Sequence, residues 1–107
     1  MLNLALAMAL QSSQAVDASN LALTSCLFAV MRTESSKRSS AEQFSEALER
    51  GCREEEADMR RDGIANLVAR GRSRNEAEAM TDELLAKVRT DLVSEYAQFA
   101  ALGLIEK

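Results

Sequence analysis

The run REEEADMRRD, from Arg53 to Asp62, holds the residues whose types and spacing come nearest to a chemical site. Glu54, Asp58 and Asp62 are four residues apart, so they share one face of a helix. Carboxylates on such a face can bind a metal ion in a helical bundle, but the known bundle sites add a Glu-x-x-His element. This chain contains no histidine, and Arg60 and Arg61 lie among the acids and would neutralise them. We therefore expect a solvated face with ion pairs, and neither a metal nor a cofactor.

Nucleophilic catalysis has equally little support. Without histidine, the serines and threonines lack the usual base that would activate them. The two cysteines, Cys26 and Cys52, are not arranged as C-x-x-C, which is the signature of thiol redox catalysis. The sequence therefore predicts that the protein is not an enzyme. An enzyme that uses carboxylates alone is the third and last alternative that we consider.

A local basic patch is expected at one tip of the molecule. The segment RRDGIANLVARGRSR concentrates five arginines around a predicted turn: Arg60, Arg61, Arg70, Arg72 and Arg74. The patch has no interleaved aromatic side chain, and the formal net charge of the chain is −4, so nucleic-acid binding is not expected. The alternative is that the patch binds an anionic surface, whether of a lipid, a cell-wall polymer or a protein.

The chain opens with MLNLALAMALQSSQAVDASN, which carries no charge before Asp17. An apolar run of about ten residues followed by small and polar residues has the form of a secretory signal peptide. Small residues at positions 13 and 15 predict cleavage between Ala15 and Val16, although no basic residue precedes the apolar run. Residues 1–15 would then be a signal peptide and residues 16–107 a single domain. The alternative is an apolar N-terminal helix packed on the core. A transmembrane span is not expected, because the run is too short.

The cysteine count supports export. An even number of cysteines in a small exported domain predicts a disulfide, here between Cys26 and Cys52. Such a bridge closes a loop of about 25 residues and contributes roughly 3 kcal/mol on chain-entropy grounds. The alternative is two buried free thiols in a cytosolic core.

The composition predicts an all-α fold. Proline is absent and glycine rare, while residues that favour helix are plentiful. We expect three helices, at about residues 18–37, 41–70 and 74–102, with a bend in the second at Gly63. The first is nearly apolar all round, which indicates a protein partner or a homo-oligomer. The third carries the clearest apolar stripe, which we expect to face inward: Ala77, Met80, Leu84, Val88, Leu92, Tyr96 and Phe99.

The second and third helices should form a long antiparallel hairpin that turns near residue 72. This register puts Leu48 near Tyr96, and it puts Glu55 opposite Arg89. We expect an inter-helix ion pair between Glu55 and Arg89, with Glu56 as the alternative partner and a solvated Glu55 as the other possibility. Because bridged cysteines need Cα atoms within about 7 Å, we also expect the first helix to continue through the polar segment to Lys37.

The pattern CLFAVMR, then F…L…C…EE, RG.S..EA and YA, resembles small exported helical proteins of bacteria. The resemblance covers most of residues 16–107, rests mainly on packing residues and implies no site. Our first reading is therefore a periplasmic or secreted helical protein with a binding or structural role. The second is a cytosolic helical adaptor or regulator with free thiols and with residues 1–15 packed in the bundle.

Overall fold

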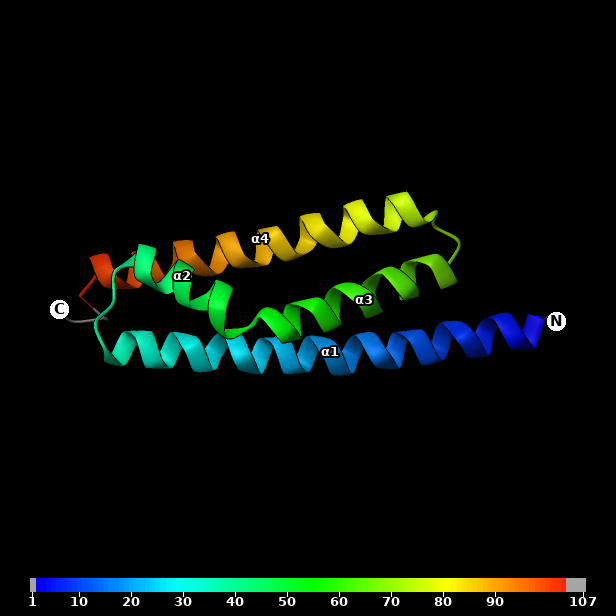
Figure 1. The fold of residues 1–107 in the computed structure, drawn as a ribbon, viewed down its shortest axis with the longest axis horizontal. Coiled ribbons are helices and arrows are strands. Elements are labelled where there is room, and N and C mark those ends of the chain that lie inside the picture. Colours follow the sequence, from blue (N-terminus) through cyan, green and yellow to red (C-terminus); the bar gives the residue numbers. More distant parts are fainter. Residues whose placement is uncertain (1, 104–107) are drawn as a thin grey trace.

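The computed structural model describes the backbone of residues 2–103 and the side chains of residues 11–103. Within that range the chain forms four α-helices and no strand: α1 Leu2–Ser36, α2 Ala41–Gly51, α3 Arg53–Ala69 and α4 Arg74–Ala101. The molecule is a rod with extents of 59 × 21 × 21 Å. In Figure 1, α2 and α3 follow one another along the middle of the rod, between α1 and α4. The expected all-α fold is confirmed.

Helix α1 is longer than expected. The sequence predicts a helix from residue 18 behind a detached segment, but α1 runs without a break from Leu2. The segment before Asp17 contains no glycine, proline or strong cap that would end a helix, and its Ala, Leu and Met favour one. The alternative in which Leu4 to Leu10 fill the core concerns side chains that lie outside the described residues.

Both turns at the two ends of the α2–α3 pair close as Schellman motifs. At the end of α1, Arg38 adopts φ = 60°, and the N–H of Ser39 donates to the carbonyl of Glu34 at 3.0 Å. Gly71 does the same after α3 with φ = 102°, which glycine adopts without steric cost. Helix α1 thus ends at Ser36, one residue before the end at Lys37 that the disulfide geometry predicts.

Capping boxes start the two helices that follow these turns. Ser40 accepts a hydrogen bond from the N–H of Gln43 and donates its own N–H to the Gln43 side chain, at the start of α2. Ser73 and Glu76 make the same reciprocal pair at the start of α4. Each box satisfies two backbone N–H groups that the helix itself leaves unpaired.

The middle of the rod bends at Cys52, not at Gly63. Cys52 has φ = −118° and ψ = 25°, which separates α2 from α3 within the predicted 41–70 helix. The bend lies where the chain is drawn against α1, since a Cβ on Gly51 would sit only 3.1 Å from Val30 Cγ2. Gly63 is instead a regular helical residue that lets α3 approach Thr81 of α4 closely. The prediction of a bend at Gly63 is therefore wrong.

The bend also shifts the register by one helical turn. Where α4 packs against α3, the two helices have the predicted register, and Gly63 lies next to Thr81. Opposite α2, however, Tyr96 stacks on Phe44, with ring centroids 4.3 Å apart, and not on Leu48 as the uniform register predicts. A buried cluster joins α1, α2, α3 and α4 around this stack: Leu23, Leu27, Phe44, Leu48, Cys52, Met59 and Tyr96.

Candidate functional site

The disulfide between Cys26 and Cys52 joins the middle of α1 to the junction of α2 and α3. The two Cα atoms are 5.9 Å apart, and neither cysteine is free. Cys52 is fully buried in the core cluster. The predicted pairing is therefore present, and it fixes α1 against the bend.

A second tie between α1 and α3 is polar. The hydroxyl of Ser19, which is buried on α1, donates a hydrogen bond to the carboxylate of Asp62 on α3. Arg61 contacts the same carboxylate through its Nε at 3.1 Å. These two donors hold the pKa of Asp62 below its ordinary value, with the bond from Arg61 the larger cause. Asp62 is thus a structural anchor of α1.

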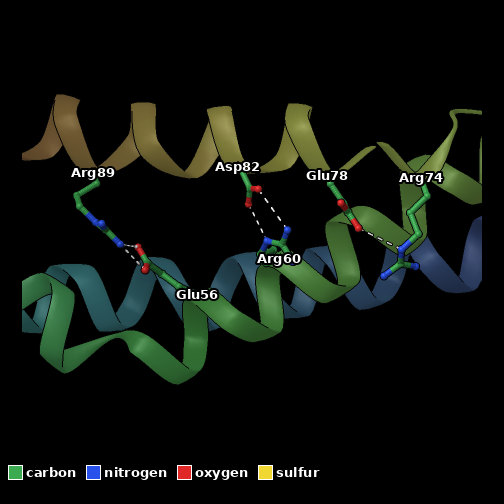
Figure 2. A network of polar contacts seen from close by, with 6 residues as sticks. All are labelled: Glu56, Arg60, Arg74, Glu78, Asp82 and Arg89. Atoms are coloured by element: carbon green, nitrogen blue, oxygen red, sulfur yellow. Dashed lines mark hydrogen bonds and ion pairs between the residues drawn. The ribbon is translucent and has the colours of Figure 1, made fainter. Parts of the chain in front are cut away.

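Ion pairs connect α3 to α4 on one face of the rod, as Figure 2 shows. Arg60 contacts Asp82 with both Nε, at 2.7 Å, and Nη2, at 3.2 Å, in a fork that holds both carboxylate oxygens. The hydrogen bond from Arg60 lowers the pKa of Asp82. Both side chains are about half exposed, so the pair sets helix register more than it adds stability.

The second pair in Figure 2 joins Arg89 to Glu56. The uniform helical register predicts Glu55 as the first partner of Arg89 and Glu56 as the alternative, and the structure selects Glu56. Helix α3 restarts at Arg53 after the bend, and its new phase turns Glu56 and Arg60, four residues apart, toward α4. Glu55, one residue earlier, is half-buried.

A hollow of about 310 Å³ lies along this face, lined in part by Arg53, Glu56, Arg60, Asp82 and Arg89. Two of its three arginines are already bonded to its two acids. An anion that entered the hollow would have to displace those carboxylates, and a cation would meet the arginines. Among the side chains of residues 11–103, no group of acids or cysteines is placed to hold a metal ion. The ion pairs that line this hollow therefore hold α3 and α4 together.

The predicted arginine patch lies around the α3–α4 turn, but acids are interspersed with it. Arg60 pairs with Asp82, and Arg61 with Asp58 and Asp62. Two further ion pairs form at the start of α4, where Arg72 pairs with Glu76 and Arg74 pairs with Glu78. Of the five arginines, only Arg70 has no ion pair with a described side chain. Binding of an anionic surface stays a prediction, now with one unpaired arginine to support it.

The opposite side of the α3–α4 pair carries an apolar groove that sequence reasoning missed. Its volume is about 380 Å³, and α1, α3 and α4 all contribute to its lining: Val16, Met59, Gly63, Asn66, Leu67, Met80, Thr81 and Leu84. Met59 and Gly63 are buried at its floor, whereas Met80 and Leu84 on its wall are 40% and 52% exposed.

The exposed wall corrects the prediction for the third helix. Met80, Leu84, Val88 and Phe99 were expected to face inward, but each is at least 38% exposed. Helix α3 covers the side of α4 that carries Ala77, Thr81 and Leu85, and α1 lies on the far side of α3, so part of the apolar stripe is left open. The apolar stripe is wider than one neighbouring helix can cover. This width is the feature of the sequence from which the exposure could have been predicted.

No helix in the described part of the chain contains a stretch long and apolar enough to cross a bilayer. Comparison of the chain with models of protein families, with curated proteins and with solved structures finds no match.

Proposed function

We propose that this chain is exported, loses residues 1–15, and acts in an oxidising compartment such as the bacterial periplasm as a small binding or structural protein without catalytic activity. The observation that carries the proposal is the Cys26–Cys52 disulfide. Disulfides form and persist in oxidising compartments and are rare in the cytosol.

The position of the predicted cleavage site is compatible with a folded mature chain. Among the described side chains of α1, those that are buried are Ser19, Leu23, Leu27 and Glu34, and all follow Val16. None of the side chains from Gln11 to Ala15 is buried. In Figure 1 the N-terminal end of α1 runs past the turn that joins α3 to α4. Loss of residues 1–15 therefore removes no buried side chain that the structure describes.

The surface favours binding over catalysis. The charged face is neutralised by pairs such as Arg60–Asp82, whereas the groove wall presents Met80 and Leu84 to solvent. Exposed apolar patches on a small protein mark interaction sites. The groove has no nucleophile–base pair in its lining, which consists of apolar residues, Asn66 and Thr81.

The experiment is expression of the full chain in a Gram-negative host, followed by fractionation and intact mass measurement. We expect a periplasmic product that begins at Val16 and whose cysteines resist alkylation. Ala15→Leu should block cleavage, because the peptidase cleft admits only small side chains, while Ala18→Leu, on the exposed side of α1, should be cleaved normally. A cytoplasmic product with an intact N-terminus and two alkylated thiols would instead identify the cytosolic adaptor.

A further inference from the structure

The two cysteines of the disulfide differ in their exposure to solvent. Cys52 is fully buried in the core cluster, whereas Cys26 is half-buried on α1. A disulfide is exchanged when a thiolate attacks one of its two sulfurs, so the rate depends on which sulfur the thiolate can reach. The folded chain therefore offers Cys26, and not Cys52, to a thiol in solution.

A hollow between α1 and α2 leads to Cys26. Its volume is about 450 Å³, and Cys26 belongs to its lining but Cys52 does not. Three of the other residues that line it are small: Ala29, Ala47 and Gly51. The sulfur of Cys26 lies 3.4 Å from the carbonyl oxygen of Gly51, which places the sulfur at this wall. Hollows of this size accommodate small organic molecules, so a low-molecular-weight thiol can enter beside the sulfur.

We propose that Cys26 is the site at which the folded chain exchanges its disulfide with a small thiol such as glutathione. The glutathione thiolate attacks Cys26 Sγ and forms a new S–S bond with it. The electron pair of the broken bond leaves with Cys52 Sγ, which takes up the proton that the glutathione thiol gave up. The product carries glutathione on Cys26 and a buried thiol on Cys52. Attack by the Cys52 thiolate on Cys26 Sγ reverses the reaction and releases glutathione.

Contacts beside the bridge keep the two helices together while it is open. Helix α1 is also held to α3 by the hydrogen bond from Ser19 to Asp62, and Leu23 and Leu27 of α1 belong to the buried cluster. The leaving sulfur therefore stays close to Cys26 and can form the bridge again. Cys26 is thus a site of reversible modification by a thiol, and this reactivity does not depend on the export proposed above.

The test uses the unmodified, disulfide-bonded chain and reduced glutathione in native buffer. Acid stops the exchange because it removes thiolates, and alkylation at acid pH in denaturant, followed by mass measurement of peptides, then locates the glutathione. We expect glutathione on Cys26 and the alkyl group on Cys52 at least about ten times more often than the reverse. Equal amounts of the two products, glutathione mainly on Cys52, or no adduct at all would overturn the proposal.

The dependence of the exchange rate on urea separates attack on the folded chain from attack on the unfolded chain. Urea lowers the free energy of unfolding by about 1 kcal/mol or more per molar, so exchange that needs unfolding should become at least about fivefold faster in about 1 M urea. We expect the rate to stay nearly constant, because Cys26 is already accessible in the folded chain. An acceleration of the larger size would mean that the hollow gives no access to the sulfur, and the proposal would be wrong.

Two matched variants test the hollow itself. Ala29→Leu adds a large side chain to its wall and should slow the exchange severalfold. Ala79→Leu makes the same change on the exposed surface of α4, outside the hollow, and should leave the rate unchanged. Both alanines are exposed, so both variants should fold, which circular dichroism checks. Equal exchange rates for the two variants would overturn the proposal, because the thiol would then not enter through the hollow.

Discussion

The phenolic hydroxyl of Tyr96 donates a hydrogen bond to the carbonyl oxygen of Ser39 at 2.7 Å, so α4 is bonded to the turn between α1 and α2. The carbonyl of Glu34, the last buried residue of α1, lies 3.2 Å from the same hydroxyl. Beneath it the ring of Tyr96 stacks on Phe44, which begins the buried face of α2. One side chain therefore joins three helices at one end of the rod.

Removal of this hydroxyl should cost stability without loss of the fold. Tyr96→Phe keeps the ring stack on Phe44 and leaves the Ser39 carbonyl without its donor. We expect the free energy of unfolding to fall by about 1–2 kcal/mol. Urea denaturation measures it. Tyr96→Leu, which also loses the stacked ring, should be less stable than Tyr96→Phe; equal stability of all three proteins would show that the hydroxyl bond is not made.

The disulfide should account for much of the stability of the chain. Replacement of Cys26 and Cys52 by Ala opens a link between residues 26 apart and should lower the free energy of unfolding by about 3 kcal/mol. Reduction of the unmodified protein should have an effect of similar size, and reduction of the Ala variant should have none. An unchanged denaturation midpoint in reductant would contradict the structural role given to the bridge.

The Asp62 carboxylate should make stability depend on acid pH. Its pKa in the folded chain lies below the ordinary 3.8, because Arg61 and Ser19 donate hydrogen bonds to the charged form. The unfolded chain therefore binds the proton more readily, and the contribution of Asp62 is present above pH 3.8 and lost as pH falls through the folded pKa.

Asp62→Asn should consequently be less stable than the unmodified chain at pH 7, by about 1 kcal/mol. The difference should shrink below the ordinary pKa of 3.8. Thermal unfolding across the acid range measures it. Asp58→Asn is the matched control, because Asp58 is exposed and, among the side chains of residues 11–103, its carboxylate pairs only with Arg61, at 3.3 Å. A difference between Asp62→Asn and the unmodified chain that is independent of pH would mean that the charge of Asp62 is not the cause.

The two neighbouring glutamates on α3 should differ in their effect. Glu56→Gln weakens the contact with Arg89, whose side chain is 35% exposed, and should cost about 1 kcal/mol. Glu55→Gln should be nearly neutral. Chemical denaturation of the two single variants and of each combined with Arg89→Gln measures the coupling. A larger coupling energy for Glu55 than for Glu56 would restore the pairing expected from the uniform helix.

Local signals in the sequence predicted the local structure well. Helices begin at residues 41 and 74 as expected, and the helix expected to end at residue 70 ends at Ala69. The backbone hydrogen bonds that set these ends are local, made by Ser40, by Ser73 and at the Gly71 turn. The spacing of Cys26 and Cys52 also predicted that the first helix continues to about Lys37, and α1 ends one residue earlier at Ser36, since the bridge constrains the level of the two helices.

Features set by tertiary contacts were not predictable in the same way. The bend at Cys52 arises where the chain is held against α1; Gly51 precedes it, but the sequence alone does not distinguish a bend there from one at Gly63. The bend then changes the phase of α3, so that Glu56 and not Glu55 meets Arg89. The exposure of Leu84 depends on which helices lie beside α4, which apolar spacing alone does not specify.

The role of the residues at the start of α1 could not be predicted, for a different reason. Apolar residues before Asp17 favour a helix whether they are a signal peptide or part of the bundle, so the continuous α1 from Leu2 is compatible with both. Export and cleavage therefore remain predictions, and their test is chemical.

The most direct test is thiol trapping of the chain in intact cells, with acid quenching, alkylation and mass measurement of the product. We expect a polypeptide that begins at Val16 and carries no alkyl group on Cys26 or Cys52. A polypeptide that retains residues 1–15 and carries an alkyl group on both cysteines would contradict the proposed export and the disulfide-stapled mature form together.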